Sequence, residues 1–329
     1  MNTKKEPGTF VISLDFELFW GMTDKTTLKQ YGENILGVRK AIPRMLELFS
    51  KYDIHATWAT VGMLAFTSKQ ELIQSLPIRK PNYGNQKLSN YVYLETANVG
   101  ENEHQDPYHF GGSLITLIQA VPHQEIGTHS FSHYYCREEG QTAETFSEDL
   151  SASLTALAPY TPRITSLVLP RNQWNETYIP ICKEHGIKAF RGNQKSFIYQ
   201  ARTEELQVNP FIRALRLLDQ YLPLTGSNTY TKEDVKKSMP RNVAASMFLR
   251  PYMPLLRLFE PLRKLRIQNA MTHAAKKGEL FHLWWHPHNF GKHTEENLAT
   301  LESILKHYSV LRKKHAMQSM TMEECSEKL

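Results

Sequence analysis

The chain has 329 residues, 41% of them hydrophobic, and a formal net charge of +6 with a sequence pI of about 9.0. This length predicts one large α/β domain or two smaller ones, and the modest positive charge favours an anionic partner such as a membrane surface or an acidic substrate. The sequence contains no nucleic-acid-binding fold motif, so we expect no nucleic acid among its partners.

The compartment is indicated by the cysteines and by the apolar runs. Cys136, Cys182 and Cys325 are scattered and form no C-x-x-C pair, which argues against a disulfide framework and favours a reducing compartment. The first residues lack the pattern of a signal peptide, and no apolar run approaches the roughly 20 residues of a membrane-spanning helix. We therefore expect a cytoplasmic protein.

Short apolar strands alternate with amphipathic helices through the first half of the chain. Apolar runs predict strands over 9–14, 54–61, 164–169 and 187–190, and apolar periodicity predicts helices over 37–52, 112–120, 145–157 and 176–185. The polar stretch 68–109 is expected to begin as a helix and to continue as a long excursion. This alternation predicts parallel βαβ units.

The rhythm breaks over about 199–279, which we interpret as a helical region inserted into a single domain of residues 1–329. It returns with an aromatic strand over 280–285, a helix over 294–314 and a short strand near 318–322.

The segment 125–133 (EIGTHSFSH) holds two histidines that are four residues apart and follow a short extended run. If the chain turns helical after Gly127, His129 and His133 can reach one point. Histidine is the commonest protein ligand for a borderline transition metal, and such a site also needs a carboxylate. Ser130 stands where the H-E-x-x-H motif has its glutamate, which argues against a metalloprotease of that type.

Polar residues gather where the predicted strands end. Asp15 and Glu17 are two positions apart at the end of the first strand, so their side chains share one face. Three other strand ends carry the remaining polar pairs, which are His129 and His133, Arg171 and Asn172, and His286 and His288. Parallel α/β folds place their sites at the carboxyl ends of strands, so these residues predict a single site.

The segments 13–17 (SLDFE), 55–62 (HATWATVG) and 125–133 resemble, in this order, the motifs of the polysaccharide deacetylases, the NodB-type enzymes of carbohydrate esterase family four. Residues 170–172 (PRN) and 286–288 (HPH) are similar to the later motifs of that family. The resemblance covers about 9–197 and 280–322. It implies a distorted (β/α)7 barrel, here with the helical insertion before the last barrel strands. It also implies a divalent metal, commonly zinc, that is used to remove N-acetyl groups from amino sugars.

The resemblance also implies roles for individual residues. Asp15 matches the family's general base, and His286 matches its general acid. The family's metal-binding aspartate is replaced by Phe16, so we interpret Glu17, on the face of Asp15, as the ligand that joins His129 and His133. Exchanged roles for Asp15 and Glu17, and a degraded metal site, stay open as alternatives.

The remaining candidates surround this centre. Arg171 is expected to contact the base carboxylate, although its proline precedes it rather than follows it. Trp284 and Trp285 are expected to wall the acetyl pocket or to pack in the core. His288 is expected to lie behind the ligands or to contact the substrate.

The expected function is metal-dependent removal of N-acetyl groups from an amino sugar, in a cell-surface polysaccharide or its lipid-linked precursor. One alternative is a C–N hydrolase that acts on a small amide with the same fold. The other is a non-catalytic carbohydrate- or lipid-binding module with a decayed metal site, which the Phe16 departure would support.

Residues 241–267 combine arginines and lysines with leucines and phenylalanines, and prolines interrupt them. Broken amphipathic helices of this composition can lie in the headgroup layer of an anionic membrane. We therefore expect a peripheral contact with the inner face of the membrane, and the alternative is packing against the barrel or a second subunit.

Overall fold

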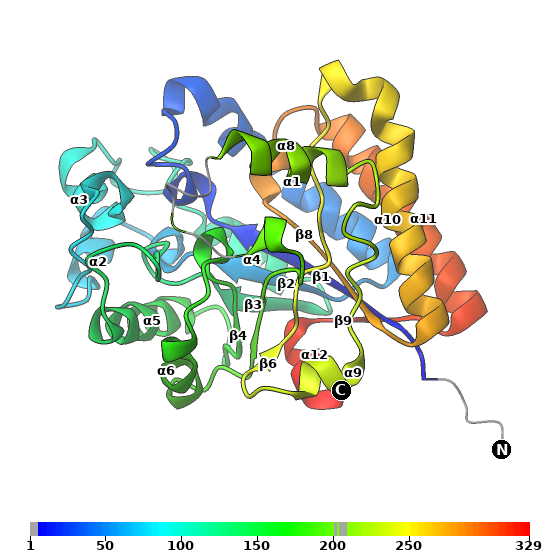
Figure 1. The fold of residues 1–329 in the computed structure, drawn as a ribbon. Coiled ribbons are helices and arrows are strands. Elements are labelled where there is room, and N and C mark those ends of the chain that lie inside the picture. Colours follow the sequence, from blue (N-terminus) through cyan, green and yellow to red (C-terminus); the bar gives the residue numbers. More distant parts are fainter. Residues whose placement is uncertain (1–5, 201–202, 204–208) are drawn as a thin grey trace.

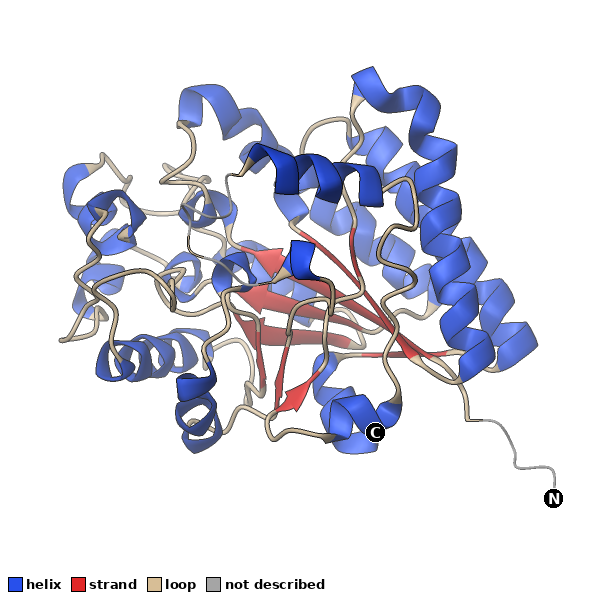
Figure 2. Cartoon of the chain, in the orientation of Figure 1, coloured by secondary structure: helices blue, strands red, loops and turns tan. Residues whose placement is uncertain are grey.

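The computed structural model describes residues 6–200, 203 and 209–329, and its centre is a parallel β-sheet with helices around it (Figure 2). The buried strand β1 (Thr9–Phe16) lies in the middle, between β2 (Ala56–Thr60) and β8 (Leu280–Trp285). The other strands are β3 (Gln124–Thr128), β4 (Ser166–Leu167), β5 (Ala189–Phe190), β6 (Arg241–Asn242), β7 (Met247–Phe248) and β9 (Gln318–Met320). The order is β6-β5-β4-β3-β2-β1-β8-β7, and β9 pairs with β1.

The two edges of this sheet are joined by a very short link. β6 and β7 lie at opposite ends of the strand order, yet only residues 243–246 separate them in the chain. Four residues span at most about 14 Å, so the edges must approach each other. The backbone N–H of Ala245 donates to Gly192 beyond β5, and that of Ser246 donates to His282 in β8. The sheet therefore curls, which confirms the predicted distorted (β/α)7 barrel.

Helices cover the outside of the sheet (Figure 1). α1 (Leu28–Tyr52), α10 (Glu260–Lys277) and α11 (Thr294–His315) pack side by side on one flank. The other described α-helices are α2 (Lys69–Gln74), α3 (Asn90–Thr96), α4 (Gly112–Gln119), α5 (Ala143–Leu157), α6 (Ile179–Glu184), α8 (Pro210–Asp219), α9 (Lys232–Lys236) and α12 (Met322–Lys328). Most of the predicted helices and strands are present, with boundaries shifted by a few residues. No helix in the described ranges is long and apolar enough to cross a membrane.

The main difference in the first half is the length of α1, which begins at Leu28 rather than near Gly37. Its apolar stripe extends upstream through Ile35, which is fully buried. Gly37 lies inside this helix. A side chain cannot be placed at this position, because a Cβ would be 1.9 Å from the carbonyl oxygen of Gly291. This close approach fixes α1 against the short 3-10 helix η8 (Pro287–Phe290), which carries His288.

The region 199–279 is less separate from the barrel than predicted. Residues 201–202 and 204–208 lie outside the described residues, and α8 and α9 are helical as expected. However, β6 and β7 belong to the sheet, and α10 connects β7 to the parallel strand β8 as a barrel helix. Two-residue strands have no periodicity of their own, which is why the sequence pattern did not reveal them.

Candidate metal centre and active site

The first wall of the site is the carboxyl end of β1. Asp15 is the last but one residue of the strand, and Glu17 follows it directly; both are 3% exposed. The next turn is the 3-10 helix η1 (Leu18–Gly21), which brings Gly21 against the Glu17 carboxyl group. A Cβ on Gly21 would lie 2.0 Å from Glu17 Cδ, so a side chain there would force the Glu17 carboxyl group to move.

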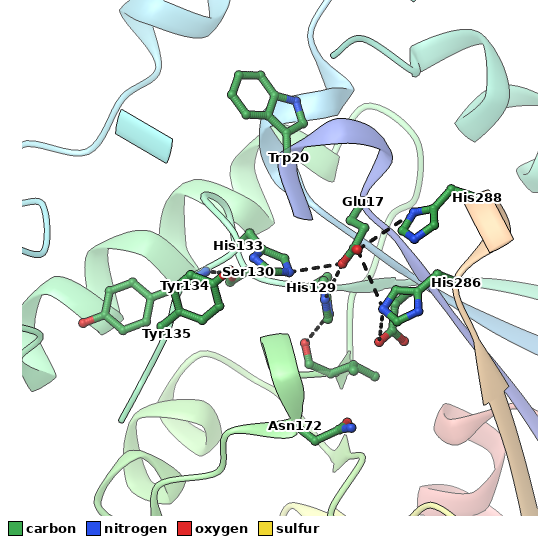
Figure 3. Close-up of polar contacts among 12 residues, drawn as sticks. Glu17, Trp20, His129, Ser130, His133, Tyr134, Tyr135, Asn172, His286 and His288 are labelled. Carbon is green, nitrogen blue, oxygen red and sulfur yellow. Dashed lines mark hydrogen bonds and ion pairs between the residues drawn. The ribbon is translucent and has the colours of Figure 1, made fainter. Parts of the chain in front are cut away.

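The second wall follows β3, where His129 and His133 point toward Glu17 (Figure 3). The segment is a turn and not the predicted helix, with positive φ at Ser130 (64°) and His133 (59°). Asp149 of α5 holds this turn by accepting hydrogen bonds from the backbone N–H groups of Phe131 and Ser132. The predicted convergence of the two rings is therefore achieved by a different backbone conformation.

Glu17, His129 and His133 form a buried cluster whose ligand atoms lie within 4.8 Å of one another. Glu17 Oε2 is 3.1 Å from His133 Nε2 and 3.4 Å from His129 Nε2. Ligands at about 2.1 Å from a tetrahedral zinc ion are separated by about 3.4 Å. The donor set therefore fits a divalent metal, and the predicted grouping of these residues is present.

The protonation states suit metal binding. His129 Nδ1 lies 2.8 Å from the carbonyl oxygen of Val168, which can only accept, so Nδ1 donates there and Nε2 is the ring nitrogen that is left to face Glu17 and bind an ion. Burial lowers the pKa of His133 to about 4 and leaves that ring neutral at pH 7. Burial acts to raise the pKa of Glu17, but His286, His129 and His133 outweigh it and hold this pKa well below its ordinary value. Neutral imidazoles and an ionised carboxylate are the forms that bind metals.

A second group of possible ligands is found among the described residues at the other end of the strands, and consists of Asp53, His55 and His123. The rings of His55 and His123 are stacked in parallel, with centroids 4.1 Å apart and an interplanar angle of 2°. Lone pairs in two parallel planes do not converge on one ion. His55 Nδ1 is also engaged with Glu324 at 2.6 Å, so this group is a weaker candidate.

Asp15 is held by Arg191, a residue that the sequence analysis did not select. Arg191 Nη1 and Nη2 donate to the two carboxylate oxygens of Asp15 at 2.6 and 2.7 Å. The guanidinium also contacts Ser13 and Asn172 and lies 4.1 Å above the ring of Trp284. Burial acts to raise the pKa of Asp15, but Arg191 and His129 outweigh it, and the pKa lies below its ordinary value.

The expected contact between Arg171 and Asp15 is absent from the described interactions. Arg171 pairs instead with Asp24 and lies 4.4 Å above the ring of Tyr135, although it also lines the pocket. Arg191 could have been selected by the rule that found the other candidates, because it directly follows the strand β5. The role of Arg171 in catalysis stays a prediction.

His286 lies between the two carboxylates. Its Nε2 is 3.7 Å from Asp15 Oδ2 and 3.7 Å from Glu17 Oε1, and its side chain is 25% exposed. Burial lowers the pKa of His286 below its ordinary value, although Glu17 and Asp15 act to raise it. His286 is thus in place to exchange a proton with Asp15.

The neighbours of His286 divide into buried and pocket-lining groups. His288 stacks on His286 with ring centroids 5.0 Å apart and is buried behind Glu17, 3.9 Å from its Oε1. Trp284 lines the pocket, whereas Trp285 is fully buried in the core against Phe290. Of the predicted tryptophan pair, only Trp284 can therefore wall the site.

His282 is a further residue that the sequence analysis missed. Its Nδ1 donates to the carbonyl oxygen of Val243 at 2.8 Å, and Ser13 donates its hydroxyl proton to Nε2 at 2.8 Å. Ser13 in turn accepts from Arg191 at 2.9 Å. This buried chain of hydrogen bonds holds Arg191 in place. It connects Val243, in the link between β6 and β7, to Asp15.

Replacing Gly21 by alanine is expected to weaken metal binding without direct loss of a ligand. The new Cβ would overlap the Glu17 carboxyl group, which would have to move away from the histidines. We expect zinc affinity to fall about 10- to 100-fold, as for loss of a group that orients a ligand. A zinc titration against a competing chelator measures it. Gly32→Ala is the control, since its Cβ would meet only the Tyr108 ring, at 3.1 Å. Equal affinity in both variants would contradict this packing argument.

Replacing Arg191 by methionine is expected to lower the free energy of unfolding by about 3–5 kcal/mol, because it leaves the buried Asp15 carboxylate without its partner. Urea unfolding at neutral pH measures the loss. Arg163→Met is a matched control, because that exposed arginine pairs with Glu323 at the surface and should cost about 0–1 kcal/mol. A loss for Arg191→Met no larger than that of the control would show that the pair does not stabilise the fold.

The fold and this site are those of a parallel barrel with a candidate metal centre at the carboxyl ends of its strands. Residues 32–190 match the family model described as polysaccharide deacetylase, which confirms the resemblance carried by the motifs. The match spans just under half of the chain, and the family that it names supports a hydrolase that acts on a polysaccharide. The match contains His129 and His133 but not Asp15, Glu17 or His286.

Solved structures share the fold at low sequence identity. A protein from Mycobacterium smegmatis described as a polysaccharide deacetylase has a TM-score of 0.60 and 12% identity, over 99% of this chain and 91% of that one. The α-amylase AmyC from Thermotoga maritima has a TM-score of 0.55 over 98% of this chain and 75% of that one, at 10% identity. PuuE allantoinase has a TM-score of 0.52 over 97% and 89% of the two chains, also at 10% identity. No curated protein matches the chain.

Proposed function

We propose that this protein is a metal-dependent deacetylase that removes the N-acetyl group from an amino sugar. The observation that carries the proposal is the convergence of Glu17, His129 and His133 next to the Asp15–Arg191 pair and His286 in one pocket. The family match supports a carbohydrate substrate. Glu17, His129 and His133 would hold the ion, for which zinc is expected, and which would polarise the acetyl carbonyl and acidify a water molecule.

The protein's own groups then move the protons. Asp15 accepts a proton from the attacking water, and Arg191 keeps the carboxylate in one orientation through two hydrogen bonds. Once a small movement closes the 3.7 Å between Asp15 Oδ2 and His286 Nε2, Asp15 passes this proton to His286, which gives it to the sugar nitrogen as the C–N bond breaks. The products are acetate and a free amino sugar. Trp284 and Phe248 line the pocket and supply aromatic surface for contact with a sugar ring, although Arg191 covers one face of Trp284.

The decisive experiment measures bound metal and acetate release together. Purified protein is expected to bind one equivalent of zinc or a similar ion, and to release acetate from N-acetylated oligosaccharides only when the metal is present. Zinc binding with hydrolysis of a small amide but of no sugar would favour the alternative C–N hydrolase. A protein that binds no divalent metal would favour the non-catalytic module.

An apolar surface next to the site supports a membrane location. This surface, named here the apolar ledge, consists of exposed residues of the 3-10 helix η7 (Pro254–Phe259) and the start of α10. Leu255 is 90% and Leu258 82% exposed. The ledge is completed by Phe259, Leu262 and Leu265. It adjoins the loop after α8, since the rings of Tyr221 and Phe259 are 6.1 Å apart.

The charges around the ledge differ from those expected. Arg263 and Arg266, which belong to the basic segment 241–267, are buried and paired with Glu260 and Asp219, so these two arginines do not form an exposed basic face. Arg257 in η7 is exposed and no acidic residue stands between 254 and 259, so the net charge of this segment is positive. We propose that the ledge inserts into an anionic membrane at the cytoplasmic face, where the substrate would be a lipid-linked glycan precursor.

Replacing Leu255 and Leu258 together by serine is expected to reduce membrane binding. Burial of a leucine contributes about 1.5–3 kcal/mol, so loss of both should weaken binding to anionic vesicles by at least about tenfold. Vesicle flotation measures this. Ile78→Ser is the matched control, because Ile78 is 95% exposed outside the ledge. If the wild-type protein floats with neither anionic nor neutral vesicles, the ledge does not bind membranes and covers another protein surface.

A further inference from the structure

Arg250 is a charged residue in the active-site pocket that the proposed chemistry does not use. It lies two residues beyond β7 and lines the same pocket as Asp15, Glu17 and His286. The ring of Phe248, at the end of β7, lies 6.0 Å from that of His286. Arg250 therefore stands one strand end away from the residue that would protonate the leaving group.

The guanidinium of Arg250 is half-buried and forms no ion pair with a carboxylate of the described residues. Its only side-chain hydrogen bond among the described residues runs from Nη1 to the sulfur of Met253 at 3.4 Å, and its buried Nε has no hydrogen-bond partner there. A guanidinium stays charged in proteins and carries five donors. Burying a guanidinium without an anion is unfavourable, so binding of an anion to Arg250 would lower the free energy.

The neighbouring buried arginines emphasise the difference. Arg191, Arg263 and Arg266 each pair with a carboxylate, from Asp15, Glu260 and Asp219 respectively. Burial lowers the pKa of Arg250, and the nearby cations Arg263 and Arg213 act in the same direction. Arg216 also lines the pocket. Arg250 thus differs from these three arginines in having no carboxylate partner among the described residues.

We propose that Arg250 binds an anionic group of the substrate, a phosphate or a carboxylate, so that the substrate is an acidic N-acetylated sugar. The inference rests on the proposed deacetylase function for the identity of the sugar, but not for the anion site itself. The planar fork of arginine fits the two oxygens of either anion. A substrate held by this group would reach across the end of β8, where His286 lies, and present its acetamide to the metal ligands that follow β1 and β3.

Binding of small sugar anions to Arg250→Gln tests the proposal. Calorimetry with the full-length protein, with zinc present, uses glucose 1-phosphate and glucuronate as probes and glucose as the neutral reference. We expect the wild-type protein to bind at least one of the two anions more tightly than glucose, and less tightly at high salt. In Arg250→Gln this affinity should fall by roughly tenfold or more, the effect of a charge-assisted hydrogen bond.

The controls separate a local effect from unfolding or from the metal. Arg79→Gln removes an exposed arginine that does not line the pocket, so this variant should bind the probes as the wild type does. Arg250→Lys keeps the charge but loses the fork, so it should fall between wild type and Arg250→Gln. The metal is the same in every variant, so the difference reports Arg250 alone.

Each outcome is decisive. Preference for glucose 1-phosphate supports a phosphorylated substrate, and preference for glucuronate supports a uronic acid. Equal affinities of wild type and Arg250→Gln for both anions overturn the proposal. Anion binding that depends on Arg250 in a protein that releases no acetate would reject the deacetylase function and keep the anion site. Acetate release by a protein whose anion binding does not depend on Arg250 would support the deacetylase function and reject the anion site.

Discussion

Replacing Asp15 by asparagine is expected to lower the turnover number by about 10²–10⁴, the usual contribution of a general base. The amide cannot take the proton of the attacking water, whereas the ligand set of Glu17, His129 and His133 is left intact. Acetate release per mole of metal-bound protein measures the effect. Zinc content should stay close to that of the wild type.

The variant has a structural cost that must be measured separately. Arg191 loses a charged partner, although it keeps its hydrogen bonds to Ser13 and Asn172. Turnover is therefore compared at a temperature where circular dichroism shows the same fold for both proteins. Near-wild-type turnover in metal-loaded Asp15→Asn would contradict the assignment of Asp15 as base and would leave Glu17 as the candidate.

Local sequence was sufficient to find the residues that lie at strand ends. Asp15 and Glu17 follow from the alternation of side chains in a strand, and His129 and His133 follow from their spacing after another strand. These rules need only the chain direction and the parallel sheet, because the carboxyl ends of parallel strands meet at one edge. The metal cluster could therefore be predicted even though the backbone of its turn was not.

The partner of Asp15 could not be chosen in this way. Arg171 and Arg191 follow the neighbouring strands β4 and β5, and nothing in either segment says which one reaches β1. The structure places Arg171 and Asn172 in the left-handed region, with φ of 54° and 51°, which turns Arg171 toward Asp24 and Tyr135. Non-glycine residues rarely adopt this conformation, so local propensity does not predict it.

The exposed face of α10 also could not be predicted from the local sequence. Its arginines at 263 and 266 look like an exposed basic stripe, but their carboxylate partners bury them, while Leu262 and Leu265 face outward. One partner, Asp219, lies far away in the chain at the end of α8. Hydrophobic periodicity assumes that charged residues face water, and buried ion pairs break that assumption.

Replacing Glu17 by glutamine is expected to weaken zinc binding by more than about 100-fold, because groups that only orient a ligand already contribute 10- to 100-fold. The amide nitrogen cannot bind the metal and the negative charge beside His129 and His133 is lost. Zinc titration of Glu17→Gln against Asp15→Asn therefore assigns the two carboxylates. Loss of zinc in Asp15→Asn with retention in Glu17→Gln would exchange their roles. Weak binding in the wild-type protein itself would mean that Phe16, in place of the family's aspartate, marks a decayed site.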